Sequence, residues 1–421
     1  MSNLKVLIIG GGGREHALSW KLKQSPKVEK IFMAPGNAGT AQIAENLGIS
    51  KKEEIIEWLK SNPMDLVVVG PDDYLAIGMT DAVRELNIPV FGPTKAAAEI
   101  EWSKSFAKEL MRTAGIPTAR FENFTDPVAA LSYIEKGSFP VVIKASGLAA
   151  GKGVIIANDF SEAEAAVKEI MESKIFGESG NTIVIEEYLL GREISTHAFS
   201  DGEHISMFPS AQDHKRIFEN DEGPNTGGMG TVAPLPWVTG DHMKVIEEQI
   251  VRPLIKALKA QGTPFRGLLF PGVMITEEGP KVIEFNARFG DPETQSYMRL
   301  LETDLVDILF ACINGTLDTQ EIKWSNKSAA TVMLASSGYP GNYEKGKEIL
   351  GLEKNTDTDI VVFHGGTKLQ DGKLVTNGGR VLGISAVGDN LQDALNKSYK
   401  AIENISFEGM QYRRDIGKKS L

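Results

Sequence analysis

The first 100 residues alternate between short apolar segments and helical patterns, and this alternation restricts the possible folds more than any other feature of the chain. The apolar segments are typical of strands buried on both faces, because they lack the polar alternation of half-exposed strands. They lie at 4–10 (LKVLIIG), 30–37 (KIFMAPGN), 64–71 (MDLVVVGP) and 89–93 (PVFGP). Helices are predicted between them, at 14–25, 51–62 and 74–86. Together these elements indicate a parallel α/β sheet.

Ligands of such a sheet bind beyond the carboxyl ends of its strands. The first of these ends is the run Gly10–Gly13, which opens a helix, and the amides at a helix N-terminus favour an anion such as phosphate. The sequence 14–16 (REH) follows where a dinucleotide fingerprint would continue its glycine spacing, and the second strand ends in Asn37, not in an acid. We therefore favour a phosphorylated small molecule over NAD, with a tight turn that binds nothing as the alternative.

The pattern changes near Lys104, after which antiparallel strands and helices are predicted. Successive antiparallel strands are expected over 182–205, one helix over 241–262 and a β-hairpin over 268–287. The tail reads as a small α+β unit. Because a chain of 421 residues is too long for one ordinary core, several domains are expected. They are predicted at 1–103, 104–325 and 326–421.

Composition excludes several classes of partner. The formal net charge is −11, with 45 Lys and Arg against 56 Asp and Glu, so no basic footprint for nucleic acid is present. No apolar run approaches the roughly 20 residues that span a bilayer. The first residues lack the basic segment and cleavage site of a signal peptide, so a cytoplasmic protein is expected. The single cysteine, Cys312, lies in an apolar run and reads as a buried hydrophobe, with a nucleophile as the minor alternative.

A glycine-rich loop joins two predicted strands in 141–156 (VVIKASGLAAGKGVII). Lys144 lies on the strand that runs into this loop and would place a point charge on phosphate oxygens. Gly147, Gly151 and Gly153 would let backbone amides approach the same oxygens. The loop is not a Walker A sequence, and it resembles the glycine-rich cover over ATP in kinases. A flexible exposed hairpin is the alternative.

The segment 184–193 (VIEEYLLGRE) ends an apolar strand in acids and continues into an apolar connector. An adenine needs a flat apolar slot with a backbone edge, which this connector could offer after Glu186 and Glu187. Glu193 is placed to accept from ribose hydroxyls. Acidic residues on a solvated edge strand are the alternative.

The segment 281–295 (KVIEFNARFGDPETQ) places Glu284, Asn286 and Arg288 on one face of a strand, at a period of two residues. Ile283 and Phe285 are expected to anchor the other face in the core. One carboxylate and one amide oxygen suffice for Mg²⁺ when nucleotide phosphates complete its ligand shell. The guanidinium of Arg288 could donate two parallel hydrogen bonds to a phosphate or a carboxylate. An ordinary surface strand is the alternative.

The segment 213–216 (DHKR) contains acidic and basic residues side by side. It precedes another glycine-rich loop at 225–230 (NTGGMG), whose backbone amides would be accessible to a ligand. His214 could act as a base. A hydrogen-bonded structural histidine is at least as good a reading, since histidine serves both roles.

Seven short motifs, taken together, resemble the glycinamide ribonucleotide synthetases, which are ATP-grasp ligases of purine biosynthesis. They are GGGREH, GLAAGKGV, QDHKR, GPNTGGMG, VIEFNARFGDPETQ, VFHGGT and TNGGRV. The resemblance extends from Leu4 to about Gly417. It implies an N-terminal parallel α/β domain, a two-part ATP-grasp domain with a mobile lid at about 120–190, and a small C-terminal α+β domain.

The resemblance also implies an activity: ATP-dependent joining of glycine to 5-phosphoribosylamine, through glycyl phosphate, in a monomeric enzyme. It places Mg²⁺ or Mn²⁺ on Glu284 and Asn286. It places ATP on Lys104, Lys144, Gly151, Glu186, Glu187, Leu189 and Glu193. It places the substrates on Gly12, Gly13, Asn37, Asp213, Asn225, Thr226, Gly227, Gly228, Arg288 and Asp291. Lys144, Asp213 and Arg288 are the implied catalytic residues. Such chemistry depends on positioning and charge neutralisation rather than on a nucleophilic side chain.

Three segments depart from the family pattern. Ser146 stands where the family usually has Asp, residues 231–233 (TVA) replace AYS, and Phe270-Pro271 replaces Tyr-Ala. None of these changes removes a charge assigned to metal or phosphate. Three other functions remain open at this point: another ATP-grasp ligase, an NAD-dependent oxidoreductase, and a nucleotide-binding regulator without catalysis.

Overall fold

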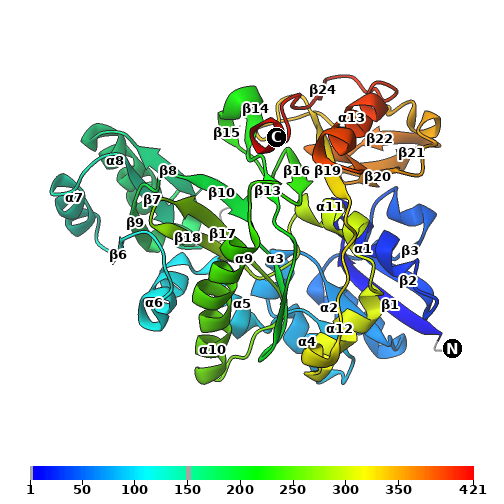
Figure 1. Ribbon diagram of the computed structural model, residues 1–421, viewed down its shortest axis with the longest axis horizontal. Coiled ribbons are helices and arrows are strands. Elements are labelled where there is room, and N and C mark those ends of the chain that lie inside the picture. Colours follow the sequence, from blue (N-terminus) through cyan, green and yellow to red (C-terminus); the bar gives the residue numbers. More distant parts are fainter. Residues whose placement is uncertain (1–2, 148–152) are drawn as a thin grey trace.

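The computed structural model describes residues 3–147 and 153–421. Gly151, which was predicted to approach the nucleotide phosphates, falls outside these ranges. The chain forms three sheets with helices around them, and a fourth, smaller sheet projects to one side (Figure 1).

The N-terminal sheet confirms the predicted parallel α/β arrangement. Its strands pair in the order β3-β2-β1-β4-β5, all parallel. The strands are β1 (Leu4–Gly10), β2 (Val28–Pro35), β3 (Glu45–Asn46), β4 (Leu66–Val69) and β5 (Val90–Phe91). The helices are α1 (Gly13–Leu22), α2 (Lys52–Ser61), α3 (Asp72–Ala76), α4 (Met79–Glu85) and α5 (Lys95–Trp102). The carboxyl end of β1 delivers the first glycine-rich loop.

The single helix predicted over 74–86 is wrong, because two short helices, α3 and α4, meet at Gly78. Gly78 has φ +73° and ψ +41°, a left-handed conformation that residues with a Cβ rarely adopt. The helix predicted over 241–262 is interrupted differently. It runs as α9 (Gly240–Ile246), a π-helical turn (Glu247–Val251) and α10 (Arg252–Ala260). Only Arg252 separates the end of the π-helical turn from Pro253, which has no amide proton to donate.

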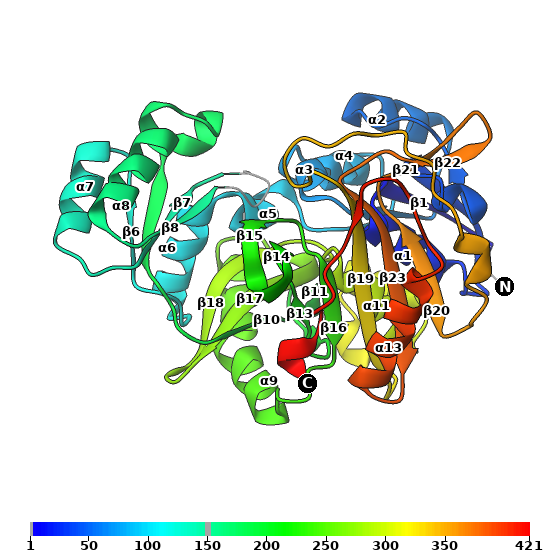
Figure 2. The same cartoon turned by 90° about the horizontal axis from the view of Figure 1, so that it is seen from above.

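The projecting unit is a four-stranded antiparallel sheet in the order β6-β9-β7-β8 (Figures 1 and 2). Its strands are β6 (Phe121–Phe124), β7 (Val141–Ala145), β8 (Val154–Ala157) and β9 (Ile183–Glu187), and its helices are α7 (Pro127–Glu135) and α8 (Phe160–Val167). A π-helical turn (Lys168–Glu172) extends α8. The unit has a hydrophobic core of its own, which includes Ala130, Ile143, Val167 and Ile185.

The central sheet contains the predicted hairpin, which is confirmed as β17 (Arg266–Thr276) and β18 (Gly279–Asn286). The other strands are β10 (Arg192–Ser195), β11 (Ala198–Asp201) and β12 (Ile205–Met207). The strands predicted over 182–205 therefore exist, but they divide between two sheets. Strands β10 and β11 do not pair with each other, because both pair with β17. Helix α6 (Lys104–Ala114) follows α5 and contributes to the same region of the molecule.

A bulge interrupts β18 and corrects one sequence expectation. Gly272 pairs with Glu284 and the next residue, Val273, pairs with Val282, so Ile283 is the extra residue. Val282 and Phe285 are buried in the core and Ile283 is only half-buried. The predicted anchoring of the strand by Ile283 is therefore wrong, although Phe285 is buried as expected.

The third sheet joins the middle of the chain to the tail. Its order is β13-β16-β19-β23-β20, with β24 on β19. The strands are β13 (Gln212–Asp213), β16 (Gly230–Ala233), β19 (Ser328–Ser336), β20 (Ile360–His364), β23 (Arg380–Gly388) and β24 (Met410–Gln411). Helices α11 (Glu293–Leu300) and α13 (Leu391–Ile402) pack on this sheet, whereas α12 (Leu305–Asn314) packs on β5, β11 and β17. Two small hairpins complete the fold: β14 (Arg216–Phe218) with β15 (Glu222–Asn225), and β21 (Thr367–Gln370) with β22 (Lys373–Thr376).

Cys312 is buried in α12, as predicted for a small hydrophobe. Among the described residues, no helix combines the length and the apolar character that crossing a membrane requires.

Candidate active site

A buried row of alternating charges connects α6, β9 and β7. The two carboxylate oxygens of Glu186 lie 2.9 Å from Lys108 Nζ and 2.9 Å from Lys144 Nζ. Lys144 Nζ also donates to the carbonyl of Ile283 at 3.0 Å, the residue that the bulge adds to β18. Burial lowers the pKa of Lys108 to about 8, against the opposing charge of Glu186. Lys144 is thus fixed between the projecting unit and the central sheet.

Lys104 begins α6 and faces the same region. Its Nζ donates to the carbonyl of Gly147 at 3.2 Å, at the described start of the glycine-rich loop. Burial lowers the pKa of Lys104, and the nearby Glu284 opposes this shift. Lys104 and Lys144 therefore lie near each other, and their binding of nucleotide phosphates stays a prediction.

Glu284 lies among several of these cations. Its Oε1 is 3.8 Å from Lys215 Nζ, which also pairs with Glu193. Burial acts to raise the pKa of Glu284, but Lys215, Lys104 and Lys144 together lower it. Glu284 is therefore ionised. Glu193, predicted to bind ribose, is engaged by Lys215 here.

Asn286 ends β18 and lies beside Arg288. Its Oδ1 accepts from Arg288 Nη2 at 3.0 Å, and its Nδ2 donates to the carbonyl of Phe270 at 3.3 Å. Arg288 Nε lies 3.1 Å from Glu101 Oε1 and 4.0 Å from Asp72 Oδ1. Burial acts to lower the pKa of Arg288, but the acids around it, Glu101 first, raise it. Arg288 is thus charged and held by carboxylates from the N-terminal domain.

Glu284 and Asn286 fit an incomplete oxygen set for a hard divalent cation. Glu284 is ionised and 36% exposed, so it remains accessible to a cation, and Asn286 offers an amide oxygen two residues further along the strand. Among the described residues, no group of three or more His, Cys, Asp and Glu could hold a metal without help. A cation here therefore needs further oxygens, such as those of nucleotide phosphates.

Asp213 lies between this region and a second pocket. Its Oδ1 is buried and has no hydrogen-bond partner among the described residues. Burial and the charge of Glu293 raise its pKa, against Lys215 and Arg380. Glu293 accepts from Ser195 Oγ at 2.9 Å, and its own pKa is raised by burial. A cationic ligand group near Asp213 would supply the missing partner.

His214 has a structural role in this arrangement. Its Nδ1 donates to the Gly230 carbonyl at 3.0 Å, and its Nε2 accepts from the Gly417 amide at 3.0 Å. Burial lowers its pKa to about 4. Both ring nitrogens are therefore occupied by backbone groups, which favours the structural reading of this residue over a base.

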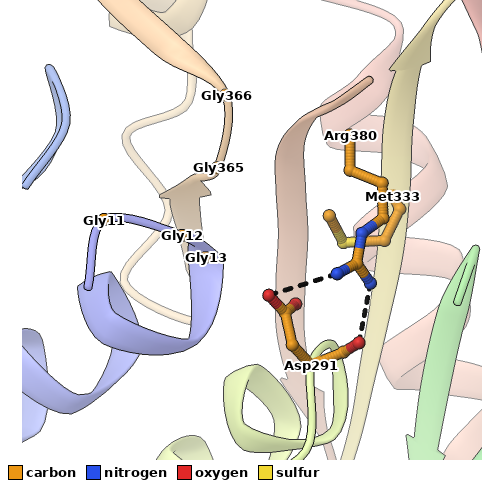
Figure 3. Close-up of a pocket in the computed structure, with 8 residues that line it drawn as sticks. All are labelled: Gly11, Gly12, Gly13, Asp291, Met333, Gly365, Gly366 and Arg380. Carbon is orange, nitrogen blue, oxygen red and sulfur yellow. Dashed lines mark hydrogen bonds and ion pairs between the residues drawn. The ribbon is translucent and has the colours of Figure 1, made fainter. Parts of the chain in front are cut away.

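The second pocket is a cavity of about 240 Å³ between the N-terminal loop and the C-terminal domain. It is lined by Gly11, Gly12, Gly13, Asp291, Met333, Gly365, Gly366 and Arg380. Figure 3 shows the loop at Gly11–Gly13 and the loop at Gly365–Gly366 on one side, and Arg380 pointing to Asp291 on the other. Burial acts to raise the pKa of Asp291, but Arg380 and then Arg14 lower it. The pocket combines backbone amides at the start of α1 with one guanidinium, which suits an anion.

The remaining predicted residues surround these two regions. Asn37 Nδ2 donates to the carbonyl of Gly11 at 2.9 Å and to the carbonyl of His364 at 2.7 Å. Its side chain therefore joins the loop at Gly11–Gly13 to the segment that leads into Gly365 and Gly366. Asn225 ends β15 and residues 226–228 follow it, and Arg380 Nη1 donates to the carbonyl of Gly227 at 2.6 Å. Thr226 Oγ1 accepts from the amide of Gly228 at 2.9 Å. Glu187 pairs with Arg120 at 2.7 Å, and Leu189 is half-buried in the connector after β9.

Three residues of this region were not identified from the sequence: Glu101, Lys108 and Arg380. Lys108 lies one helical turn after Lys104, a spacing that could have indicated a shared face. Arg380 follows the glycines of TNGGRV, and an arginine after a backbone-rich loop is a signal for anion binding. Glu101 had no such signal, because its partner Arg288 is distant in the sequence.

Ser146, one of the three departures, has a clear structural role. Its Oγ accepts from the amide of Ser105 at 3.0 Å, in the first turn of α6. An aspartate could satisfy the same amide. Phe270 stacks on His197 with ring centroids 4.1 Å apart and lies beneath Arg288, 5.9 Å from the guanidinium.

Comparison with known proteins gives matches along nearly the whole chain. Models of the phosphoribosylglycinamide synthetase N domain, ATP-grasp (A) domain and C domain match residues 4–101, 102–294 and 329–419. A phosphoribosylamine–glycine ligase from Caldanaerobacter subterraneus is 48% identical over 415 residues, 98% of this chain and 99% of that protein. The trifunctional purine biosynthetic protein adenosine-3 of Homo sapiens is 47% identical over 99% of this chain and 42% of its own length.

Solved structures agree with these matches. The crystal structure of phosphoribosylamine–glycine ligase from Thermotoga maritima has a TM-score of 0.86 and 36% identity, covering 98% of this chain and 100% of that one. A biotin carboxylase from Campylobacter jejuni, at 16% identity and a TM-score of 0.75, shares the fold. With three domain models matched in order and full-length relatives near half identity, the chain belongs to the phosphoribosylglycinamide synthetase family, as its motifs predicted.

Proposed function

We propose that this chain is a phosphoribosylamine–glycine ligase. It joins glycine to 5-phosphoribosylamine with ATP, and it releases glycinamide ribonucleotide, ADP and phosphate, a step of purine biosynthesis. The observation that carries the proposal is that segment 213–228 reaches both regions: Lys215 lies 3.8 Å from Glu284 of the proposed metal strand, and the Gly227 carbonyl accepts from Arg380 of the anion pocket at 2.6 Å. A ligase that joins two substrates after using ATP needs these regions to meet at one point.

The nucleotide is proposed to lie between the projecting unit and the central sheet. Lys104 and Lys144 neutralise its phosphates, while Glu186, Glu187 and Leu189 border the adenine. Glu193 accepts from the ribose after giving up Lys215. Glu284 and Asn286 hold Mg²⁺ or Mn²⁺, which supplies charge neutralisation to the triphosphate.

Glycine is proposed to bind between Arg288 and Asp213. Its ammonium group provides the cationic partner that the buried Asp213 Oδ1 lacks, and this favours ionised Asp213. Its carboxylate attacks the γ-phosphorus, the bond to the ADP oxygen breaks, and glycyl phosphate forms. Arg288 stabilises the charge on the transferred phosphoryl group.

Phosphoribosylamine is proposed to occupy the 240 Å³ cavity. Arg380 and the amides of Gly12 and Gly13 bind its phosphate, and Asp291 accepts from its ribose hydroxyls. The amine attacks the carbonyl carbon of glycyl phosphate, the carbon–oxygen bond to phosphate breaks, and the amine loses a proton. Asn37 and residues 225–228 fix the loops that border both substrates.

A coupled assay tests the proposal. Phosphoribosylamine is made in situ, and ADP release is followed while glycine is replaced by other small amino acids. ADP release that depends on both glycine and phosphoribosylamine is expected. Release with a different acid would indicate another ATP-grasp ligase, and tight NADH binding without ADP release would indicate an oxidoreductase.

A further inference from the structure

The backbone amide that follows β18 is satisfied by a side chain from another domain. Asn286 makes the last pair of β18, with Phe270, so the amide of Ala287 has no strand partner. Glu101, in the last turn of α5, accepts this proton through Oε2 at 2.7 Å. The Glu101 side chain is only 9% exposed, so water has little access to the contact. Glu101 therefore fixes the point at which the chain leaves the proposed metal strand.

The second oxygen of the same carboxylate holds Arg288. Glu101 Oε1 lies 3.1 Å from Arg288 Nε, as an ion pair. The other two guanidinium nitrogens donate elsewhere, Nη2 to Asn286 Oδ1 at 3.0 Å and Nη1 to the Phe289 carbonyl at 3.3 Å. A planar guanidinium held along one edge has its orientation fixed, whereas a free arginine samples many rotamers.

The contact between Arg288 and Asn286 involves the oxygen that a divalent cation would use. A cation at Asn286 Oδ1 competes with the Arg288 donor, because both are positive. Glu101 then remains as the carboxylate nearest to the guanidinium, since Asp72 is 4.0 Å from Nε and more exposed. The released Nη2 group would then be available to a phosphate oxygen.

We propose that Glu101 is a positioning residue, which holds Arg288 through Nε so that Nη2 meets the transferred phosphoryl group. This inference rests on the proposed function for the role of Arg288. In the proposed arrangement Glu101 contacts neither substrate nor nucleotide. It acts through Arg288 and through the backbone at Ala287, and its effect should therefore appear in turnover more than in nucleotide affinity.

Glu101→Gln separates the two contacts of this residue. The amide oxygen of Gln can still accept from the Ala287 amide, but its NH₂ group meets the Arg288 donor and cannot hold it. We expect kcat to fall by about 10- to 100-fold, with KM for ATP within about threefold of the unaltered chain. Glu101→Asp keeps the charge on a shorter side chain and should recover part of kcat.

Glu99→Gln is the matched control. Glu99 lies on the same helix but lines a separate cavity between α4 and α5, away from Arg288. Its kcat should remain within about twofold of the unaltered chain. A loss in Glu99→Gln equal to that in Glu101→Gln would overturn the proposal, because it would show a general effect on α5.

Arg288→Met and the double variant decide whether Glu101 acts through Arg288. If it does, adding Glu101→Gln to Arg288→Met costs no further kcat, so the losses are not multiplicative. Multiplicative losses would overturn the proposal.

The same variants form a second double-mutant cycle when their stability is measured. The quantity compared is the urea concentration at which half of the ligand-free protein is unfolded, and it does not depend on the reaction. Arg288→Met leaves Glu101 buried without its partner, so the double variant should unfold at a higher urea concentration than Arg288→Met alone. A lower midpoint for the double variant would refute the pairing. An unaltered chain without glycine-dependent ADP release would refute the proposed function instead, so the two failures are distinguishable.

Discussion

Arg380, in strand β23, and Asp291, in the turn after strand β18, are joined at two points. Nη1 of Arg380 donates to the Asp291 carbonyl at 2.6 Å, and Nη2 lies 3.3 Å from the Asp291 carboxylate. Two domains thus meet at the wall of the anion pocket. The pairing also fixes the only guanidinium among the residues that line this pocket in the described structure.

Replacing this guanidinium should weaken binding of the phosphorylated substrate. Arg380→Met is expected to raise KM for phosphoribosylamine by about 10- to 100-fold, because a charge-assisted hydrogen bond to phosphate is lost. KM for ATP should change little. Arg414→Met, at an exposed arginine of the tail, is the control. Steady-state assays with each substrate varied in turn make the comparison, and an equal increase in both KM values would refute the assignment.

The proposed metal strand gives a second prediction. Glu284→Ala should abolish turnover, since Asn286 alone offers a single neutral oxygen to a divalent cation. Calorimetric titration of Mg²⁺ in the presence of a non-hydrolysable ATP analogue should show weaker binding. Glu277→Ala, in the exposed turn between β17 and β18, should behave like the unaltered chain. Retention of most activity by Glu284→Ala at limiting Mg²⁺ would contradict the assignment.

Lys144 supports a third prediction, on ATP affinity. Lys144→Ala should raise KM for ATP by about 10- to 100-fold, because a buried cation aimed at the phosphates is removed. Its ion pair with Glu186, at 2.9 Å, is also lost, although Lys108 remains on the other oxygen. Lys136→Ala, on the exposed surface of the same unit, controls for general effects on this unit. An unchanged dependence of rate on ATP concentration would exclude Lys144 from the phosphate site.

Much of this arrangement could be predicted from local sequence. Buried strands separated by helices were enough for the parallel sheet, and the period-two spacing of Glu284 and Asn286 was enough to place them together. The helix break at Gly78 and the bulge at Ile283 were not predicted. Each depends on one residue whose backbone conformation is set by its surroundings.

Contacts between domains were beyond a sequence-based prediction. Glu101 and Arg288 are 187 positions apart, and no local pattern connects a helix end with the residue after a strand. Asn37 was predicted as a substrate residue from the family, yet its side chain is bound to the carbonyls of Gly11 and His364. Such roles depend on which loops the fold brings together, and periodicity holds no information about that.

Four buried histidines predict how the free energy of unfolding depends on pH. Burial lowers the pKa of His16 to about 3, with a smaller contribution from His364. Burial also lowers the pKa of His214 and His364, each to about 4, and it lowers the pKa of His197 well below its usual value. In the unfolded chain these residues protonate near pH 6.5. Between pH 6.5 and about 4 the unfolded state therefore binds more protons than the folded state, so the free energy of unfolding falls as the pH falls.

Urea unfolding at pH 7, 5.5 and 4.5 measures this dependence. Each histidine contributes a loss of up to roughly 3 kcal/mol by pH 4, as an order of magnitude. His214→Gln should be less stable at pH 7, because Gln cannot reproduce both backbone contacts, but its stability should fall less steeply below pH 6.5. A slope equal to that of the unaltered chain would show that His214 takes up its proton at the same pH in the folded and unfolded states. In that case its Nε2 would not accept from the Gly417 amide below pH 6.5, and His214 would again be a candidate for proton transfer.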